Sequence, residues 1–327
     1  MRFLVVIVVV ISQACGNGKA MPPADAAISI VDPNIIITDS DGVSNLVGDG
    51  TNLYWVSSVP LSGNQLEHQI KTAPASGGAP RLLISRGQHD PTALVIDGDT
   101  LYWAELIDPA SNDGAVMSMP TAGGAVTLVA SGLVGPGQLA IGPSNIYFVT
   151  GSEVRSMPKS AGAASTHVTD TGVDNVSHLV LQGTTLILLD YAHVMSAPAA
   201  GGPPRVLQMA INNSSGLAAN TTSLFVNADN GQLDKRPALV EKIDPVSGVD
   251  SVIQSYADRG TSSIVADDTD AFWIVEVPHA FTITRLALAS ATMSTFQQVP
   301  AASQLVLNPS HVYWVASDGT AIARAPR

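Results

Sequence analysis

Apolar and polar residues recur along the chain in a nine-residue pattern. Each copy starts at an apolar residue, passes through turn-forming and polar residues, and ends in apolar or aromatic residues. The seven copies are Val47–Trp55, Val95–Trp103, Ala140–Phe148, Val180–Leu188, Ala218–Val226, Val265–Trp273 and Val306–Trp314. Their ends lie 38 to 48 residues apart. Repeats of this length with a drifting period predict seven structural units joined by loops of variable length.

Each unit is expected to contain four short strands. In the unit around Trp103 the expected strands are Thr92–Ile96, a second strand from Leu101, Ala115–Met119 and Val126–Ala130. Gly98-Asp99 can form a tight turn after the first strand, because glycine adopts positive φ angles without steric cost. No segment shows helical periodicity with capping residues. Four-stranded units without helices predict an all-β fold, a seven-bladed β-propeller.

The two ends of the repeat region complement each other. The seventh unit stops at Ala321–Arg327, in the place of a third strand, and so lacks a fourth. A strand-like run, Asn34–Thr38, stands immediately before the first unit. We therefore predict that Ile35–Thr38 pairs with Ala321–Arg327, so that the N-terminal strand closes the last blade and protects its edge. The alternative is a strand that only decorates the ring.

The first residues have the pattern of an export signal. Met1-Arg2 supplies a positive charge, and Phe3–Ile11 is an apolar run, too short to span a bilayer but typical of a signal-peptide core. The single cysteine of the chain follows in Ala14-Cys15-Gly16. This segment resembles the lipobox of bacterial lipoproteins, which implies that Cys15 becomes the lipidated first residue after cleavage. An ordinary signal peptide cut near Ala14 is the alternative.

These patterns divide the chain into three parts. Residues 1–14 are expected to be the signal peptide, and residues 15–33 the lipidated cysteine with a flexible tether. Residues 34–327 are expected to form a single β-propeller domain. The resemblance to a lipobox implies an exported protein of the bacterial cell envelope, an outer-membrane lipoprotein. The protein would then contact the membrane only through its lipid anchor.

The ends of the repeats carry a second resemblance. Aromatic pairs close five of the copies: Tyr54-Trp55, Tyr102-Trp103, Tyr147-Phe148, Phe272-Trp273 and Tyr313-Trp314. Over residues 34–327 this pattern resembles the Tyr-Trp repeat of YWTD-type and TolB-like propellers, as found in many bacterial surface lipoproteins. The Thr-Asp that completes the YWTD motif is absent, and YWTD domains have six blades rather than seven. The resemblance therefore implies a fold and carries no activity with it.

Composition narrows the range of partners. Only 13 % of the residues are charged, and the formal net charge is −12. An acidic surface repels phosphate backbones and anionic lipid headgroups, and no basic run interrupts it, so nucleic acid is excluded as a partner. With Cys15 used as an anchor, no thiol is left for a disulfide or for a Cys-ligated metal.

One face of the predicted propeller gathers polar residues. Loops between blades share this face with the loops between second and third strands, which are expected to begin near Glu105 and Asp190. The candidate ligand-binding residues on these loops are His89, Asp90, Glu105, Asp174, Asp190, Asn212 and Asp258. Polar groups that converge at a concave mouth are the default site hypothesis, and solvated turn residues are the alternative.

Metal and cofactor chemistry finds little support in the sequence. The seven histidines do not recur at one register of the repeat, as a metal ring built from equivalent blades would require. No cofactor is implied. Oxygen ligands at an acidic channel mouth could hold a divalent cation, so that option stays open.

Two classes of function remain. The chain contains no Gly-x-Ser-x-Gly, His-Glu-x-x-His, phosphate-binding loop or EF-hand pattern, and we assign no catalytic residue. The first hypothesis is a cell-envelope binding or assembly module that uses the loop-lined face for a protein, peptide or glycan. The alternative is a propeller hydrolase or lyase with acid–base carboxylates at the channel mouth. One fold can carry many functions, so the fold alone does not decide between these two hypotheses.

The lipobox gives a first testable prediction. Cys15→Ser is expected to abolish metabolic labelling with palmitate and to move the protein from the membrane fraction to the soluble fraction, because the acylated thiol is removed. Unlabelled, soluble wild-type protein would contradict the lipobox interpretation and favour cleavage near Ala14.

Overall fold

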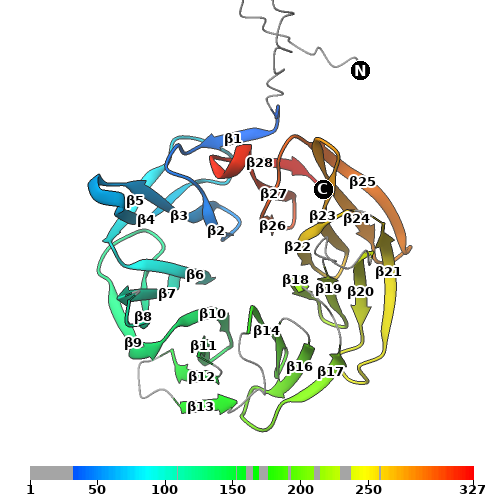
Figure 1. Cartoon of the computed structure of the whole chain (residues 1–327), viewed down its shortest axis with the longest axis horizontal. Helices are drawn as coiled ribbons and strands as arrows, with labels where there is room; N and C mark the ends of the chain where they lie inside the picture. Colours follow the sequence, from blue (N-terminus) through cyan, green and yellow to red (C-terminus); the bar gives the residue numbers. More distant parts are fainter. Residues whose placement is uncertain are drawn as a thin grey trace, which may run out of the picture. The chain divides into compact units, whose positions relative to one another are not determined.

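The computed structural model describes residues 32–108, 110–151, 153–159, 165–168, 176–190, 193–209, 214–228, 237–257 and 259–327. Asp32–Arg327 is one compact unit. Within the described residues the strands form seven four-stranded antiparallel sheets, which are arranged as blades around a central channel (Figure 1). The predicted seven-bladed β-propeller is therefore confirmed.

The blades follow the chain in order. Blade 1 contains β2 (Ser44–Gly48), β3 (Asn52–Pro60), β4 (Leu66–Pro74) and β5 (Arg81–Gly87). Blade 2 contains β6 (Asp90–Asp97), β7 (Thr100–Asp108), β8 (Asp113–Pro120) and β9 (Thr127–Val134). Blade 3 contains β10 (Pro136–Ile141), β11 (Asn145–Thr150), β12 (Glu153–Pro158) and β13 (Ser165–Val168). Blade 4 contains β14 (His178–Gln182), β15 (Thr185–Leu189), β16 (His193–Pro198) and β17 (Arg205–Met209).

The remaining blades complete the ring. Blade 5 contains β18 (Ser214–Ala219), β19 (Leu224–Ala228), β20 (Ala238–Ile243) and β21 (Asp250–Tyr256). Blade 6 contains β22 (Thr261–Ala266), β23 (Asp270–Val277), β24 (Ala280–Ala287) and β25 (Thr292–Val299). Blade 7 contains β26 (Leu305–Leu307), β27 (His311–Ala316), β28 (Ala321–Pro326) and β1 (Ile35–Thr38). Two short 3-10 turns, Ser62–Asn64 and Ser317–Gly319, connect second to third strands. In the described part of the chain, no helix is long and apolar enough to cross a membrane.

The antiparallel course of each blade gives the ring two faces. The loop face carries the blade-to-blade connections and the turns between second and third strands. The turn face carries the turns between first and second strands and the Gly-Gly turns before the outer strands. These definitions are kept below.

The predicted closing pair is present. β1 pairs antiparallel with β28, with Ile35 opposite Ala323 and Thr38 opposite Ala321. Ile37 is buried in the apolar core that blades 7 and 1 share. The blade that ends the repeat therefore obtains its outer strand from the segment that precedes the first repeat (Figure 1).

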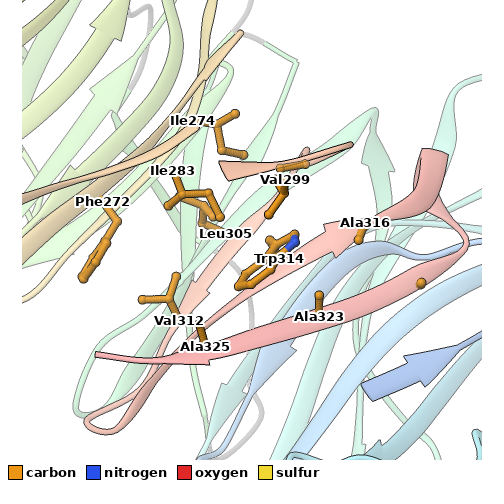
Figure 2. Close-up of a cluster of buried hydrophobic side chains, with 12 residues drawn as sticks. Phe272, Ile274, Ile283, Val299, Leu305, Val312, Trp314, Ala316, Ala323 and Ala325 are labelled. Carbon is orange, nitrogen blue, oxygen red and sulfur yellow. The ribbon is translucent and has the colours of Figure 1, made fainter. Parts of the chain in front are cut away.

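Apolar side chains fill the space between neighbouring blades. The four tryptophans lie at equivalent positions of second strands, as the repeat predicts, and all are fully buried: Trp55, Trp103, Trp273 and Trp314. Figure 2 shows the cluster between blades 6 and 7, where Trp314 lies among Val299, Leu305 and Val312. An aromatic side chain buries more apolar surface than other side chains, which explains why the repeat ends in aromatic residues.

Each tryptophan also has a hydrogen-bond acceptor for its indole N–H. Trp55 donates to Asp39 Oδ2 at 2.8 Å, and Trp103 donates to Glu105 Oε2 at 2.7 Å. Trp273 donates to the hydroxyl of Tyr256, and Trp314 to Asp32 Oδ2. A buried indole without an acceptor would lose the hydrogen bond that it makes with water in the unfolded chain, so these acceptors stabilise the fold.

The inner strands bulge where blades meet, and side chains of the adjacent blade bind the freed backbone. The pairing of β2 with β3 shifts register between Ser44 and Val47, so Leu46 loses its ladder partner. The amide side chain of Gln304, which precedes β26, accepts from Leu46 N and donates to Leu46 O, both at 2.9 Å. Because buried backbone groups must be paired, Gln304 links blade 7 to blade 1.

Similar bonds join further blades. Asn45 Nδ2 donates to Pro91 O at 3.1 Å between blades 1 and 2, and Thr92 Oγ1 donates to Pro136 O at 2.8 Å between blades 2 and 3. Ser215 Oγ donates to Thr261 O at 2.8 Å between blades 5 and 6, and Leu305 N donates to Ser263 Oγ at 2.9 Å between blades 7 and 6. Each runs between a polar side chain near the start of one inner strand and the backbone of the next blade. The ring is thus held by directional bonds as well as by apolar contact.

Removal of the closing strand should destabilise the ring. Deletion of residues 34–38 is expected to lower the melting temperature by at least about 5 °C, since each kcal/mol of lost stability lowers it by about 2–4 °C in a domain of this size. Ile37 and the β1–β28 hydrogen bonds would be lost together. Differential scanning calorimetry of the purified protein measures the change. An unaltered melting temperature would show that β1 does not contribute to closure.

Candidate functional site

The predicted site residues fall into two groups. The structure describes His89, Asp90, Glu105 and Asp190. Asp174, Asn212, Asp258 and the proposed lipidation site Cys15 lie outside the described residues. His89, Asp90 and Glu105 come together on the loop face at the junction of blades 1 and 2. Asp190 lies on blade 4, directly after β15, where its carboxylate contacts the ring nitrogen Nδ1 of His193 at 2.9 Å.

Glu105 is the buried centre of this group. The prediction that a loop begins near Glu105 is wrong, because β7 continues to Asp108 and keeps Glu105 inside the sheet. Its carboxylate accepts from Arg86 Nε at 2.8 Å and from Trp103 Nε1 at 2.7 Å. His89 Nδ1 lies 3.3 Å from Glu105 Oε1. Glu105 therefore fixes an arginine of blade 1 and an imidazole of the blade 1–blade 2 loop.

Glu105 is held in its ionised form. Burial alone would raise the pKa of this carboxyl, but the hydrogen bonds from Arg86 and Trp103 outweigh burial and leave the pKa below its usual value. The guanidinium of Arg86 also lies 5.6 Å from the centre of the Trp103 ring, within cation–π range. A general acid needs a raised pKa, so Glu105 is suited to positioning and not to proton donation.

A serine, a histidine and an aspartate lie beside this group. Ser58 and His68 face each other on β3 and β4, with Ser58 Oγ 3.1 Å from His68 Nδ1. Asp90 Oδ1 lies 3.6 Å from the same nitrogen. A nucleophilic relay needs the serine and the acid on opposite ring nitrogens. The arrangement is therefore a polar contact between blades 1 and 2 and does not have the geometry of a catalytic triad.

A second polar cluster lies at the junction of blades 7 and 1. Lys71 Nζ binds Asp39 Oδ1 at 2.8 Å and Asp41 Oδ2 at 2.7 Å. Ser57 Oγ and Trp55 Nε1 also donate to Asp39 Oδ2. Both Lys71 and Asp39 are buried. The ammonium occupies the space between the two carboxylates, so this acidic pair serves ring closure.

Sequence reasoning missed Lys71, although the repeat contains a signal for it. Lys71 lies opposite Trp55, in the register position that Met117 and Met195 occupy in blades 2 and 4. A charged residue at a buried repeat position implies a buried partner of opposite charge. Within the part of the chain that the structure describes, no three His, Cys, Asp or Glu side chains are grouped to hold a metal ion.

The loop face at blades 1 and 2 also exposes apolar side chains. The β3–β4 hairpin ends in Leu61 and Leu66, which are 44 % and 43 % exposed. Ile107 and Val134 are exposed at the matching end of blade 2, since Asp108 pairs with Asp113 and Asp113 with Val134. This mixture of apolar and ionised groups distinguishes the junction from its surroundings.

The central channel has a different lining. A cavity of about 540 Å³ is bordered by the inner strands of all seven blades, and its lining residues are aliphatic or glycine. In most of those strands they belong to the second half, nearer the turn face. None of the four predicted site residues that the structure describes borders this cavity. Three of these four, His89, Asp90 and Glu105, gather at the junction of blades 1 and 2.

Comparison with known proteins supports the β-propeller fold but assigns the chain to no family. No protein-family model matches the chain, and a search of curated proteins gives no match. Among solved structures, the nidogen–laminin complex has a TM-score of 0.52 at 13 % identity, with 78 % of this chain and 92 % of that chain covered. The β-propeller domain of the Trilobed protease from Pyrococcus furiosus has a TM-score of 0.61 at 7 % identity, with 87 % and 97 % covered.

A third structure extends the range of these propellers. The extracellular domain of a one component system from B. thetaiotaomicron has a TM-score of 0.59 at 8 % identity, with 87 % of this chain and 40 % of that chain covered. At such identities the similarity shows the β-propeller fold alone.

The buried Lys71–Asp39 pair gives a stability prediction. Lys71→Met is expected to lower the free energy of unfolding at pH 7 by about 3–5 kcal/mol, because loss of one partner leaves a buried charge uncompensated. Lys159→Met is the matched control, since Lys159 pairs with Asp97 at a more exposed position and should cost less than about 1 kcal/mol. Urea denaturation measures both. Equal losses would contradict the assigned role of Lys71.

The same pair gives a pH dependence. Burial alone would raise the pKa of Asp39, but hydrogen bonds from Lys71, Ser57 and Trp55 outweigh it and lower the pKa below 3.8. A carboxylate with a lowered folded-state pKa stabilises the fold above its unfolded-state pKa and loses that contribution as the pH falls through the folded value. The difference between wild type and Lys71→Met should therefore shrink below about pH 4. A constant difference from pH 7 to pH 3 would exclude this linkage.

Proposed function

We propose that the chain is a non-catalytic binding or assembly module of the bacterial cell envelope, which contacts a protein, peptide or glycan partner through its loop face. The observation that carries the proposal is the junction of blades 1 and 2, where the partly exposed His89 and Asp90 lie beside exposed apolar hairpin ends. Asp174, Asp190, Asn212 and Asp258 are proposed to extend this surface around the ring.

The composition of the junction favours a protein or peptide over a glycan. Leu61, Leu66 and Ile107 offer apolar area for the centre of an interface, and the ionised groups offer a polar rim. Glu105 is buried and is bonded to the partly buried Arg86, so together they hold His89 in place before a partner binds. A pre-ordered surface loses less conformational entropy when a partner binds.

The hydrolase or lyase alternative has less support. Glu105 has a lowered pKa, and the Ser58–His68–Asp90 contacts converge on one ring nitrogen. Glu241 does have a pKa raised by burial, but its carboxylate accepts from Gln208 between the outer strand of blade 4 and the third strand of blade 5. It therefore lies between blades 4 and 5, away from the junction of blades 1 and 2.

The envelope location rests on the first residues of the chain. We propose cleavage after residue 14 and lipid attachment at Cys15, with residues 15–33 as the tether between the membrane and the propeller. A lipid anchor would keep the ring near partners on the same membrane and raise their effective concentration.

Photocrosslinking in living host cells tests the proposed surface. A photoreactive phenylalanine analogue at Leu61 should give a discrete adduct, because Leu61 lies on the proposed surface. The same analogue at Val246, which is 77 % exposed in a turn-face loop, is the matched control and should give none. Charge reversal of Asp90 together with Asp174 should reduce the Leu61 adduct at least tenfold, because it removes two acidic contacts. Equal adduct yields from both positions, or a Leu61 adduct whose yield the charge reversal leaves unchanged, would contradict the proposal.

A further inference from the structure

A second cavity lies on the turn face, at the junction of blades 1 and 2. Its volume is about 570 Å³, within the range of small-molecule sites. The polar residues that line it include Asp49, Tyr54, Thr72, Arg81, Asp99 and Thr121. The cavity is open to a small polar ligand.

The wall formed by blade 1 is rigid. Asp49 Oδ1 accepts from the backbone N–H groups of Thr51 at 2.8 Å and Asn52 at 2.7 Å. Asp49 Oδ2 accepts from the hydroxyl of Tyr54 at 2.8 Å. These bonds lock the turn between β2 and β3. The carboxylate of Asp49 is therefore part of the wall and is already used.

Arg81 differs from its counterpart in blade 4. Residues 72–81 and 196–205 align without gaps, and Arg81 and Arg205 both begin an outer strand. Arg205 donates to the carbonyl oxygens of Val246 at 2.7 Å and Ser247 at 3.3 Å, which ties blade 4 to the turn of blade 5. The side chain of Arg81 makes no hydrogen bond or ion pair with any described residue, while its backbone pairs with Thr72 in the sheet. The guanidinium of Arg205 joins two blades, whereas that of Arg81 lines the cavity without a partner among the described residues.

Asp99 differs in the same way from its neighbour Asp97. Asp97 pairs with Lys159 of the next blade junction. The carboxylate of Asp99 has no partner among the described side chains. Its backbone oxygen accepts from the N–H of Thr121 at 2.8 Å and from the hydroxyl of Thr121 at 3.3 Å. Arg81 and Asp99 do not pair with each other. Two opposite charges thus border one cavity with space between them.

We propose that this cavity binds a small zwitterion of the amino-acid type, with its carboxylate on Arg81 and its ammonium on Asp99. Arginine binds carboxylates through two parallel hydrogen bonds, which fixes orientation as well as charge. The opposite charge on Asp99 favours an ammonium and disfavours a second anion. The hydroxyl groups of Thr72 and Thr121 donate to Leu53 O at 2.8 Å and to Asp99 O at 3.3 Å, so towards a ligand they can act as acceptors.

Isothermal titration calorimetry of the full chain tests the proposal. The probes are the free amino acids, acetate as a carboxylate alone, and methylammonium as an ammonium alone. At least one amino acid should bind saturably, and acetate and methylammonium should bind at least tenfold more weakly because each engages one charge only. Arg81→Gln and Asp99→Asn should each weaken amino-acid binding at least tenfold.

Two matched variants complete the test. Arg205→Gln and Asp97→Asn remove the same groups from positions that are already bonded within the fold, so both should bind within twofold of wild type. All four variants are checked for an unchanged circular dichroism spectrum. The proposal is overturned if no amino acid binds, if acetate binds as tightly as the amino acid, or if Arg205→Gln weakens binding as much as Arg81→Gln.

Discussion

The ring depends on a strand pair between two segments that lie far apart in sequence. β1 and β28 have few hydrogen bonds between them, but both ends of β1 are fixed by buried carboxylates. Asp32, before β1, accepts the indole N–H of Trp314 in blade 7. Asp39, after β1, accepts that of Trp55 in blade 1 and binds Lys71. The closing strand is thus bonded to the two blades on either side of the gap, which offsets the entropy cost of closing so long a loop.

The architecture can be predicted from the sequence because each repeat specifies its own strands and turns through residues that are close together in the chain. Each nine-residue copy carries the end of an inner strand, a turn and the start of a second strand, and the missing fourth strand of the last unit indicates how the ring closes. These features depend on residues a few positions apart. The apolar residues of each copy face a neighbouring blade in the same way every time, so seven copies require seven blades.

The polar contacts could not be predicted in the same way. Arg86 and Glu105 belong to different blades, and Lys71 reaches a carboxylate 32 residues earlier. A pattern along the chain does not state which side chains meet across a junction. Glu105 shows the consequence, because an error of a few residues in the end of β7 turns an apparent loop residue into a buried one. The free guanidinium of Arg81 is visible only by contrast with Arg205 in the folded ring.

The tryptophan positions repeat, but their acceptors repeat only in part, since the residue two positions after the tryptophan accepts in blades 1 and 2 and not in blades 6 and 7. Two acceptors precede the tryptophan in the chain as aspartates, one follows it by two residues as a glutamate, and one is a tyrosine on an outer strand. The indoles of Trp273 and Trp314 bind acceptors outside their own repeat units, so a copy of either unit placed elsewhere would leave the acceptor behind, whereas Glu105 and Ser57 would move with Trp103 and Trp55. An orphaned buried donor costs about 1–3 kcal/mol. The repeat units of Trp273 and Trp314 are therefore specific to their places, and the order of the blades in the ring cannot be shuffled without loss.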